Sequence, residues 1–580
     1  MKSTDAQEAV RVVHRHVPEL PVNLHPNPLV HRLLAARGVT DPDELSFPLG
    51  SLPRPDTLLH INDAVGRLLQ AREDEEQIVI LGDYDCDGAT STCVAMLGLR
   101  MLGFRNIDYL IPSRFEFGYG LSPGIVEVAW QLHRPSLILT VDNGVASVDG
   151  VACARQLGID VLVTDHHLAP ALLPDAAAII NPNLPGSPFP ARNLAGVGVI
   201  FYTLLAVRRA LAERGDAFAG GALGELLDLV AIGTVADVVP LDRTNRTLVE
   251  QGLRRIRAGA TRPGVLALLA SSGRQVATMS TRDIGFGIAP RLNAAGRLDD
   301  MSIGVRCLLA ETDQQARDLA ATLNDLNQSR RDIERDMRAS AERQLQNDYL
   351  SELQVSPSFT VCLMDEDWHE GVIGILAGRI KETLHRPCAL FTADGENTLK
   401  GSVRSIRGVH IRDVLQDIST GHPGMIHKFG GHAMAAGLTL QRDQFDSFCQ
   451  SFEARVCQVM DGRLKLREYE VDGSLSRGER TLENAQMLAL LMPWGQGFDA
   501  PLFADRFRVS SRKIVGTGHL KLMLTAEEGE RPVDAIAFNR EDTVEIGDSV
   551  YVVYALEVNT WRDRQQLQLR VLHLEPDVLR

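Results

Sequence analysis

Short apolar segments alternate with helix-like segments along the first half of the chain. Four runs are rich in β-branched residues and read as strands: QIVILGDYD, SLILTVDNGV, IDVLVTDHH and AAAIINPN. Between them lie segments of helical character such as ATSTCVAMLGLRMLGF and SVDGVACARQLG. Strands that alternate with helices are typical of a parallel sheet covered by helices on both faces. The pattern therefore predicts an α/β fold for this half.

A long stretch from Thr312 to about Gln346 contains neither glycine nor proline. Its apolar positions recur at spacings near three, four and seven: Leu319, Leu323, Leu326, Ile333 and Met337. This spacing indicates an amphipathic helix longer than is usual in globular proteins. Two shorter helices joined by a turn are the alternative, but no turn residue marks a break. We therefore expect a linker helix between domains.

The pattern changes twice after this helix. From near Pro357 the order strand, helix, strand, strand indicates a second α/β domain, and from about Glu468 short alternating strands with polar turns indicate a small antiparallel barrel. The predicted division is an N-terminal extension (1–50), a first α/β domain (51–310), the linker helix (311–350), a second α/β domain (351–465) and the barrel (466–580).

Length and composition agree with several domains of an ordinary globular protein. A chain of 580 residues is too long for one hydrophobic core. No run approaches the ~20 apolar residues of a membrane-spanning helix, and the N-terminus lacks the apolar core of a signal peptide. The eight cysteines are scattered and form no CxxC pair, which favours reduced thiols. We therefore expect a cytoplasmic protein without membrane contact.

The overall charge argues against a polyanionic partner. With 60 Lys and Arg against 75 Asp and Glu, the net charge is −15, which repels nucleic acid at long range. Binding to nucleic acid therefore needs local basic patches, or divalent cations that neutralise a cluster of carboxylates. The sequence offers candidates for both.

The strongest local signal is the segment Gly82–Gly88, GDYDCDG, at the end of an apolar run. It places Asp83, Asp85 and Asp87 at alternating positions. In open α/β sheets the carboxyl ends of the strands line the binding crevice. Clustered carboxylate oxygens suit Mg²⁺ or Mn²⁺. A solvated acidic turn is the alternative interpretation of this segment by itself.

Further Asp and His residues follow the next apolar runs. Asp142 ends one run, His166 and His167 follow Thr164-Asp165 after another, and Asp237 follows GTVA near the end of a helical pattern. Each segment could be a helix cap or a turn, but their repetition in one predicted sheet favours a metal site. Imidazoles mixed with carboxylates favour Mn²⁺ over Mg²⁺, although both ions remain possible.

The ordered set DYDCDG, VDN, TDHH and GTVADVVPL resembles the motif series of the DHH phosphoesterases. The likeness extends through PRLNAAGRL, LNDLNQSRRDIE, GSVRS, GGHAMAAG and PWGQGFDAPLF, which covers nearly the whole chain. It is strongest to the bacterial single-strand-specific exonucleases of that family. The resemblance implies an α/β fold with a DHH-type parallel-sheet catalytic domain, a long linker helix, a second α/β domain of the DHHA1 type and a C-terminal OB-like β-barrel.

The resemblance also implies a catalytic centre with two Mn²⁺ or Mg²⁺ ions. Asp142 is the best candidate for a ligand that bridges both ions, His167 is expected to face the scissile phosphate, and Asp83 has a supporting catalytic role. The implied metal ligands are Asp85, Asp87, Asp142, His166 and Asp237.

Substrate-binding residues are likewise implied by matching motifs. Ser402, Arg404 and Arg114 match family positions that hold a terminal 5′-phosphate, a task that suits the planar guanidinium fork. A surface ion pair is the alternative role for any one arginine. The residues expected along the path of the strand are Arg291, Asn293, Arg297 and His432.

The predicted barrel supplies a local basic track. By resemblance it is an oligonucleotide-binding fold, and its first strands carry few acidic residues. Such a track can follow a phosphate backbone although the whole chain is acidic. Its members are Arg506, Arg508, Arg512, Lys513 and Lys521.

The resemblance implies a 5′→3′ exonuclease of single-stranded DNA that releases 5′-mononucleotides and acts in recombination and mismatch repair. Single-strand-binding protein and a helicase would then be its partners. One alternative is a DHH phosphodiesterase that acts on short oligonucleotides, cyclic dinucleotides or pyrophosphate; the linker helix and barrel argue against it. Another is an inactive strand-binding subunit, against which the intact set of metal-ligand residues argues.

Overall fold

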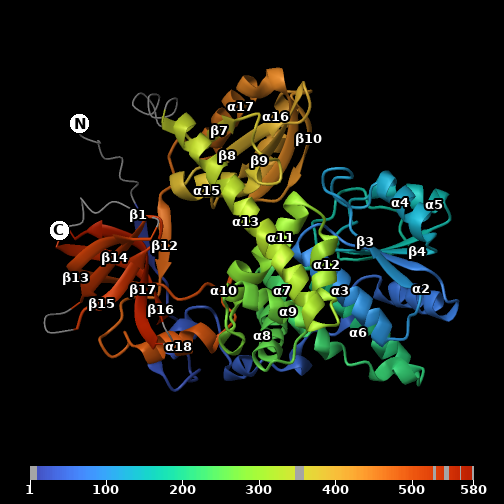
Figure 1. Cartoon of the computed structure of the whole chain (residues 1–580), viewed down its shortest axis with the longest axis horizontal. Helices are drawn as coiled ribbons and strands as arrows, with labels where there is room; N and C mark the ends of the chain where they lie inside the picture. The colour runs from blue at the N-terminus through green and yellow to red at the C-terminus, as the bar shows by residue number, and fades with distance from the viewer. Residues whose placement is uncertain are drawn as a thin grey trace. The chain divides into compact units, whose positions relative to one another are not determined.

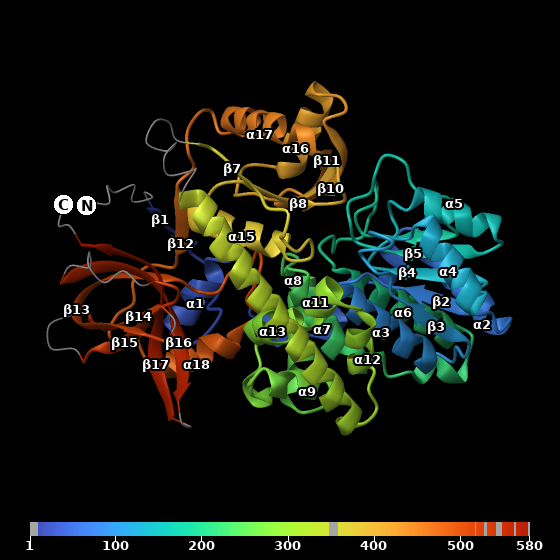
Figure 2. The same cartoon turned by 45° about the horizontal axis from the view of Figure 1, so that its top comes forward.

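The computed structural model describes residues 10–346, 358–516, 518–526, 531–540, 548–561 and 564–577. The chain divides into two units, each of which is described by itself (Figures 1 and 2). The first comprises Val13–Asn324 with Glu470–Arg580, and the second Met1–Val12 with Asp325–Tyr469. Among the described residues, no helix is both long and apolar enough to cross a membrane.

The first unit contains a five-stranded sheet in the order β3-β2-β4-β5-β6, in which every pair of neighbours is parallel. Strands β2 and β4 are buried along their whole length, because helices cover both faces of the sheet. This confirms the predicted parallel α/β fold. The strand bounds are β2 Ile78–Leu81, β3 Ile107–Leu110, β4 Leu137–Val141, β5 Asp160–Thr164 and β6 Ala178–Ile180.

Helices α3 and α6 cover one face of this sheet, and α4 and α5 cover the other (Figure 1). The strand order reverses at β2, because the chain passes first outward to β3 and then to β4 on the opposite side. Ligands of open α/β sheets bind at such a switch point, beyond the carboxyl ends of the strands. The helix bounds are α3 Cys86–Met101, α4 Pro123–His133, α5 Val148–Gln156 and α6 Gly196–Glu213.

Further helices surround α3 and α6 in this unit. Helix α7 contacts α3, α6 and α8. The remaining bounds are α1 Pro28–Ala35, α2 Ile61–Glu73, α7 Leu227–Ala236, α8 Arg243–Arg257, α9 Pro263–Ser271, α10 Thr281–Asp283, α11 Ala289–Leu298 and α12 Ser302–Leu308.

A closed barrel completes the first unit, with the strand order β13-β14-β15-β17-β16. Side chains of β14 are alternately buried and half-buried, as expected for a strand with one face in a core. The predicted OB-like barrel is thus confirmed. Its elements are β13 Phe503–Val515, β14 His519–Thr525, β15 Val533–Ala537, β16 Ser549–Trp561 and β17 Arg564–Pro576, preceded by α18 Leu482–Leu491.

The second unit has a five-stranded sheet in the order β10-β11-β9-β8-β7, in which only β7 and β8 are parallel. Long helix α13, Asp313–Gln344, begins in the first unit and ends in this one, which confirms the predicted linker helix. The other elements of this unit are β7 Val361–Met364, α15 Ile373–Leu384, β8 Cys388–Ala393, β9 Thr398–Arg404, α16 Ile411–Gly421, β10 Ile426–Gly431, β11 Ala435–Gln441 and α17 Phe445–Val459. Strand β1 Val10–His14 pairs with β12 Arg467–Val471, and the division between the units falls within both strands. All eight cysteines are free thiols, as predicted.

A buried ion pair fastens the N-terminal segment of the first unit to the segment that leads into the barrel. Arg37 Nη1 and Nη2 donate to the two carboxylate oxygens of Asp472 at 2.8 Å, and both side chains are almost fully buried. We expect Arg37→Met to lower the free energy of unfolding by about 3–5 kcal/mol, because it removes both hydrogen bonds of the cation to a buried carboxylate, which keeps the more distant Arg15 Nε at 3.7 Å as its counter-charge. The loss is measured by denaturant unfolding of purified protein.

Arg214→Met is the matched control, because the Arg214–Glu73 pair is exposed on both sides. Its loss should stay below about 1 kcal/mol. Equal losses in the two variants would show that the buried pair has no special role.

Candidate metal centre

The acidic motif lies at the switch point of the parallel sheet. Asp83, Asp85 and Asp87 follow β2, and Asp85 is the N-cap of α3, where its side chain accepts the Gly88 N–H at 2.9 Å. Asp83 and Asp87 are buried. The turn from strand to helix therefore brings three carboxylates to the carboxyl edge of the sheet.

Asp142 follows the neighbouring strand β4 in an unfavourable backbone conformation. Its φ is +63°, in the left-handed region that non-glycine residues rarely adopt. Only 2% of the residue is exposed. Left-handed non-glycine residues concentrate at functional sites, where the surrounding structure offsets their strain. This conformation fits a side chain that is held in place for function.

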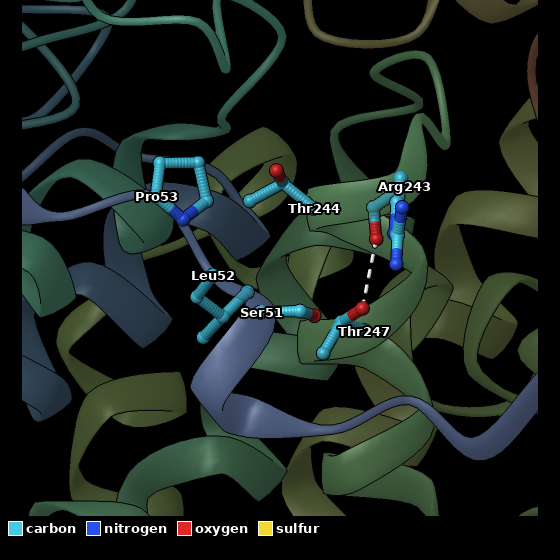
Figure 3. A pocket seen from close by; sticks show the side chains of 6 residues that line it. All are labelled: Ser51, Leu52, Pro53, Arg243, Thr244 and Thr247. Carbon is cyan, nitrogen blue, oxygen red and sulfur yellow. Dashed lines mark hydrogen bonds between the residues drawn. The ribbon is translucent and has the colours of Figure 1, made fainter. Parts of the chain in front are cut away.

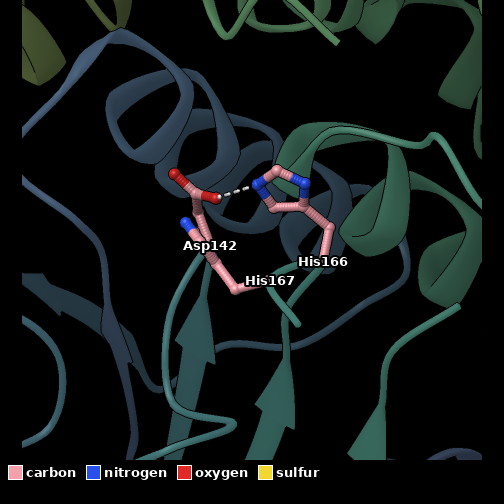
Figure 4. Close-up of side chains that lie close together, drawn as sticks. All are labelled: Asp142, His166 and His167. Carbon is pink, nitrogen blue, oxygen red and sulfur yellow. Dashed lines mark ion pairs between the residues drawn. The ribbon is translucent and has the colours of Figure 1, made fainter. Parts of the chain in front are cut away.

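His166 connects Asp142 with a residue from a different element. Its Nε2 lies 3.2 Å from Asp142 Oδ1 and 3.5 Å from Asp237 Oδ2, and Figure 4 shows the first of these contacts. Asp237 caps the carboxyl end of helix α7, whereas His166 and His167 follow strand β5. Packing of α7 against α3 thus adds a carboxylate that no strand of the sheet supplies.

Three overlapping groups of side chains have ligand atoms close enough to hold a metal ion. They are Asp83-Asp85-Asp142, Asp142-His166-His167 and Asp87-His166-Asp237, in each of which the atoms lie within 4.8 Å of one another. We call these seven residues the metal-ligand cluster. Apart from their contacts with His166 Nε2, the buried oxygens Asp142 Oδ1 and Asp237 Oδ2 have no hydrogen-bond partner among the described residues. Buried carboxylate oxygens beside an imidazole fit Mn²⁺ or Mg²⁺.

Two glycines give the carboxylates the room they need. A Cβ at Gly196 would lie 2.5 Å from Asp142 Cβ and Oδ1, and a Cβ at Gly233 would lie 2.6 Å from Asp87 Oδ1. Gly196 also begins α6, where its N–H and that of Val197 donate to the Asp87 carboxylate at 2.7 and 3.1 Å. The helix terminus thereby fixes Asp87, since its N–H groups have no partner within the helix.

His167 is held by two residues that the sequence did not single out. Asp165 Oδ1 contacts His167 Nδ1 at 2.8 Å, and the Tyr119 hydroxyl lies 3.0 Å from Nδ1 and 3.2 Å from Nε2. Asp165 is buried and also accepts the Val145 N–H at 2.9 Å. Asp165 stands in the recognised TDHH segment, so its position was visible in the sequence, but its orienting role was not.

The proximity of these carboxylates shifts their protonation. Burial, with repulsion from Asp85, raises the pKa of Asp83 to about 8, and the same two causes raise the pKa of Asp237 to about 7. Burial lowers the pKa of His167, but the hydrogen bond and charge of Asp165 outweigh this and raise it to about 9. Burial and neighbouring carboxylates also raise the pKa of Asp142 well above its usual range. Without a cation the cluster therefore holds protons.

These shifts predict a pH-dependent stability of the metal-free protein. Between pH 4 and 9 the folded protein binds more protons than the unfolded chain, because the folded pKa values of Asp83, Asp237 and His167 are raised. Stability should therefore fall as pH rises through this window. Melting temperatures of chelator-treated protein measured across the window test this.

Saturating Mn²⁺ should make the melting temperature depend less on pH, because the ion binds the deprotonated carboxylates and displaces the protons. The Asp237→Asn variant is the control and should show a shallower slope without metal. A melting temperature that rises with pH in the metal-free protein would contradict the proposed protonation.

Helix α11 carries three predicted substrate-binding residues and packs against the acidic motif. Asn293 Oδ1 accepts the Cys86 N–H at 2.8 Å, so Asn293 contacts the start of α3. Arg297 lies close enough to Tyr84 to interact with its phenol electrostatically. Arg291 is buried and donates to the Gly287 carbonyl at 2.7 Å. Contact of these residues with a strand stays a prediction, and for Arg291 the structure shows bonds inside the protein.

Arg114 also stands beside the acidic motif. Its guanidinium carbon lies 4.8 Å from the centre of the Tyr84 ring, a cation–π contact. Tyr84 follows Asp83 directly in the chain. Because Arg114 and Arg297 both act on Tyr84, positive charge borders the metal-ligand cluster on its own unit.

Ser402 and Arg404 come together on β9 of the second unit. Arg404 Nη1 donates to Ser402 Oγ at 3.1 Å and to the Val403 carbonyl at 2.9 Å. A Cβ at Gly374, in the first turn of α15, would lie 2.7 Å from Arg404 Nη2 and 3.0 Å from Ser402 Oγ. His432 is exposed between β10 and β11. A guanidinium, a hydroxyl and a helix N-terminus in one place form an arrangement that suits phosphate.

A cavity of about 380 Å³ lies elsewhere in the first unit (Figure 3). Its lining comprises Ser51, Leu52, Pro53, Arg243, Thr244 and Thr247. The Ser51 hydroxyl donates to the Pro48 carbonyl, and that of Thr247 to the Arg243 carbonyl. None of the predicted site residues lines this cavity. The cavity is therefore separate from the metal-ligand cluster, which is the candidate site.

Comparison with known proteins agrees with this geometry. Residues 77–234 match the DHH family, N-terminal domain, residues 356–457 match the DHHA1 domain, and residues 471–573 match the RecJ OB domain. The single-stranded-DNA-specific exonuclease RecJ of Haemophilus influenzae is 46% identical over 567 residues, which cover 96% of this chain and 98% of the relative.

Solved structures show the same likeness. The chain matches RecJ of Thermus thermophilus in complex with Mn²⁺, with a TM-score of 0.78, 29% identity and coverage of 98% of this chain and 80% of the other. It also matches the complex of that protein with Mg²⁺, with a TM-score of 0.73, 28% identity and coverage of 98% and 78%. From its sequence, its domains and its fold, the chain belongs to the RecJ family of DHH-domain proteins.

Proposed function

We propose that the protein is a metal-dependent exonuclease that hydrolyses single-stranded DNA from its 5′ end. The observation that carries this proposal is the metal-ligand cluster, complete at the switch point of the parallel sheet in a chain whose relatives are named single-stranded-DNA-specific exonucleases. An inactive binding subunit has no need for seven converging ligand residues. The alternative of an inactive strand-binding protein is therefore less well supported.

The metal ligands in this proposal are Asp85, Asp87, Asp142, His166 and Asp237, which would hold Mn²⁺ or Mg²⁺. Bound ions would supply an activated water and stabilise charge on the leaving oxygen. Asp142 and His166 each belong to two of the three groups in the cluster, and Asp142 is the member of this pair whose carboxylate could serve more than one ion. The helix α6 terminus holds Asp87 in place, and His166 links Asp142 with Asp237.

His167 and Asp83 have supporting roles in this mechanism. Asp165 orients the His167 ring and favours its charged form, so that His167 can donate a hydrogen bond to an oxygen of the scissile phosphate. Asp83 accepts the Tyr84 N–H at 2.8 Å, which fixes the turn that carries the other two carboxylates. Asp83 is therefore proposed to shape the acidic motif in addition to any contact with an ion.

The 5′→3′ polarity rests on recognition of a terminal phosphate. We assign this to Ser402 and Arg404, with Arg114 as a further contact. Burial lowers the pKa of Arg404, yet its guanidinium remains a cation at neutral pH because its ordinary pKa is far higher. Arg291, Asn293, Arg297 and His432 are proposed to line the path of the strand. The basic track on the barrel would contact the strand farther along, although Arg506 pairs with Asp577 and Lys521 with Asp534.

Place of action and partners complete the proposal. The proposed place of action is the cytoplasm, in recombination and mismatch repair. The proposed partners are single-strand-binding protein and a helicase, in agreement with the family of the chain. Pull-down of each candidate partner with the purified protein tests these contacts.

The test of the proposed function uses single-stranded oligonucleotides of several tens of nucleotides, labelled at either end, with Mn²⁺, Mg²⁺ or chelator. Release of the 5′ label as mononucleotide, with stepwise shortening of the 3′-labelled strand only when metal is present, supports it. Binding without cleavage in every metal would instead support a strand-binding subunit. Equal rates on dinucleotides would support a short-oligonucleotide phosphodiesterase.

A further inference from the structure

Exposed apolar side chains stand next to residues of the metal-ligand cluster. Leu168 follows His167 and is 60% exposed, and Val238 follows Asp237 and is 61% exposed. Tyr119, whose hydroxyl contacts His167, is 48% exposed. Single exposed apolar residues are ordinary on protein surfaces, but here one contacts the cluster and two adjoin its members in the chain. We call Tyr119, Leu168 and Val238 the apolar rim.

Val238 is both exposed and conformationally strained. Its φ is +63°, which is unfavourable for a β-branched residue, whereas glycine or asparagine adopts this conformation at lower cost. Neither burial nor the backbone therefore explains why a valine stands at this position. Strained residues cluster at functional sites, so Val238 is a candidate for a functional side chain.

Tyr119 is about half exposed beside the same residues. Gly118 and Gly120 flank it with φ values of +74° and +80°. Its hydroxyl points to His167 and lies 3.3 Å from the Asp142 carbonyl, so the ring stands at the edge of the cluster. The Tyr84 ring meets it edge-on at 6.3 Å. Tyr119 is 48% exposed and its ring contacts with Tyr84 and His167 are T-shaped, and an aromatic ring with exposed area is suited to contact another flat ring.

We propose that the apolar rim binds the base of the nucleotide whose phosphate lies at the metal-ligand cluster. This inference rests on the proposed function. All four bases have apolar faces, so such contacts are independent of sequence. A base inside a duplex is stacked on both faces and must leave the stack before it reaches the rim. The rim thus favours single strands through recognition of an unpaired base.

The test compares first-nucleotide release from two 5′-phosphorylated single strands, one natural and one with an abasic residue at the second position from its 5′ end. Release of the terminal mononucleotide breaks the strand at the phosphate of this second nucleotide. Wild-type kcat/KM should be about 5- to 50-fold lower on the abasic strand, since stacking on one base is lost. On the natural strand, Leu168→Ser and Val238→Asn should each lower kcat/KM by about 5-fold or more. On the abasic strand they should cause little further loss, because residue and base act as one pair.

Stability supplies an independent readout. Val238→Asn should melt at or above the wild-type temperature, because asparagine tolerates the left-handed conformation better. A purely structural role for Val238 would lower activity and melting temperature together. Leu172→Ser is the control for Leu168, since Leu172 is 68% exposed on the same loop and lies outside the rim; its kcat/KM should equal that of wild type.

Equal losses on both strands, or no loss in either rim variant, would overturn the inference and leave the proposed function intact. If the wild-type protein failed to cleave the natural strand in any metal, the proposed function itself would fall. The two failures are therefore distinguishable in one set of assays.

Discussion

Asp142→Asn should abolish turnover while the metal-free protein becomes more stable. The asparagine keeps the size of the side chain and tolerates the left-handed φ of +63°. It removes the carboxylate that two groups of the metal-ligand cluster share. We expect kcat to fall by at least about 1,000-fold, because charge stabilisation by metal ions is worth several kcal/mol.

Without metal, the Asp142→Asn variant should be more stable than the wild-type protein, although it has lost its activity. Burial and the surrounding carboxylates raise the pKa of Asp142, so its charge is unfavourable in the metal-free fold. Asp142→Asn removes this repulsion, and the melting temperature in chelator should rise. The same variant should gain little from added Mn²⁺, because its affinity for the ion is reduced. Single-turnover cleavage and melting curves with and without Mn²⁺ measure both effects.

The control is Asp149→Asn, an exposed aspartate in helix α5 close to Asp142 in the sequence. It should retain wild-type turnover and the full stabilisation by Mn²⁺. Turnover of Asp142→Asn within about 10-fold of wild type would exclude Asp142 as a shared ligand, since one tenfold step corresponds to only about 1.4 kcal/mol.

The second large loss of activity is expected for Gly196→Ala, which adds a single methyl group. Gly196→Ala places a Cβ 2.5 Å from Asp142 Cβ and Oδ1, so the carboxylate must move. Displacement of a catalytic group by about 1 Å can lower the rate about 100-fold. We expect a loss of this size in kcat. Helix α6 itself should remain folded, because alanine favours a helix more than glycine does.

Gly198→Ala is the matched control, two residues farther along the same helix. Its Cβ would meet only the flexible side chain of Leu194, at 3.1 Å. Activity assays with Mn²⁺, together with circular dichroism of both variants, distinguish a local displacement from unfolding. If both variants lost activity equally, the close approach of Gly196 to Asp142 would not explain the effect.

Much of the site could be predicted from the sequence. The acidic motif, Asp142 and the two histidines each follow an apolar run, and parallel strands bring their carboxyl ends to one edge. The order of these motifs indicated the family, and the hydrophobic pattern separately predicted the linker helix, the second α/β domain and the barrel. Other features could not be read in this way. The orienting bond of Asp165, the contacts of Tyr119 and the internal bonds of Arg291 all depend on how the folded chain places these side chains.

The sequence by itself determined which segments form strands and helices and which residue types end them. Periodicity and β-branched runs are local properties, so they are visible without a fold. Only the tertiary structure decided which of these ends meet. Packing of α7 against α3 brings Asp237 to His166, and the N-terminus of α6 holds Asp87. The need for glycine at positions 196 and 233 follows from the same packing, because distances of a few ångströms between distant segments are set by the fold and leave no local pattern.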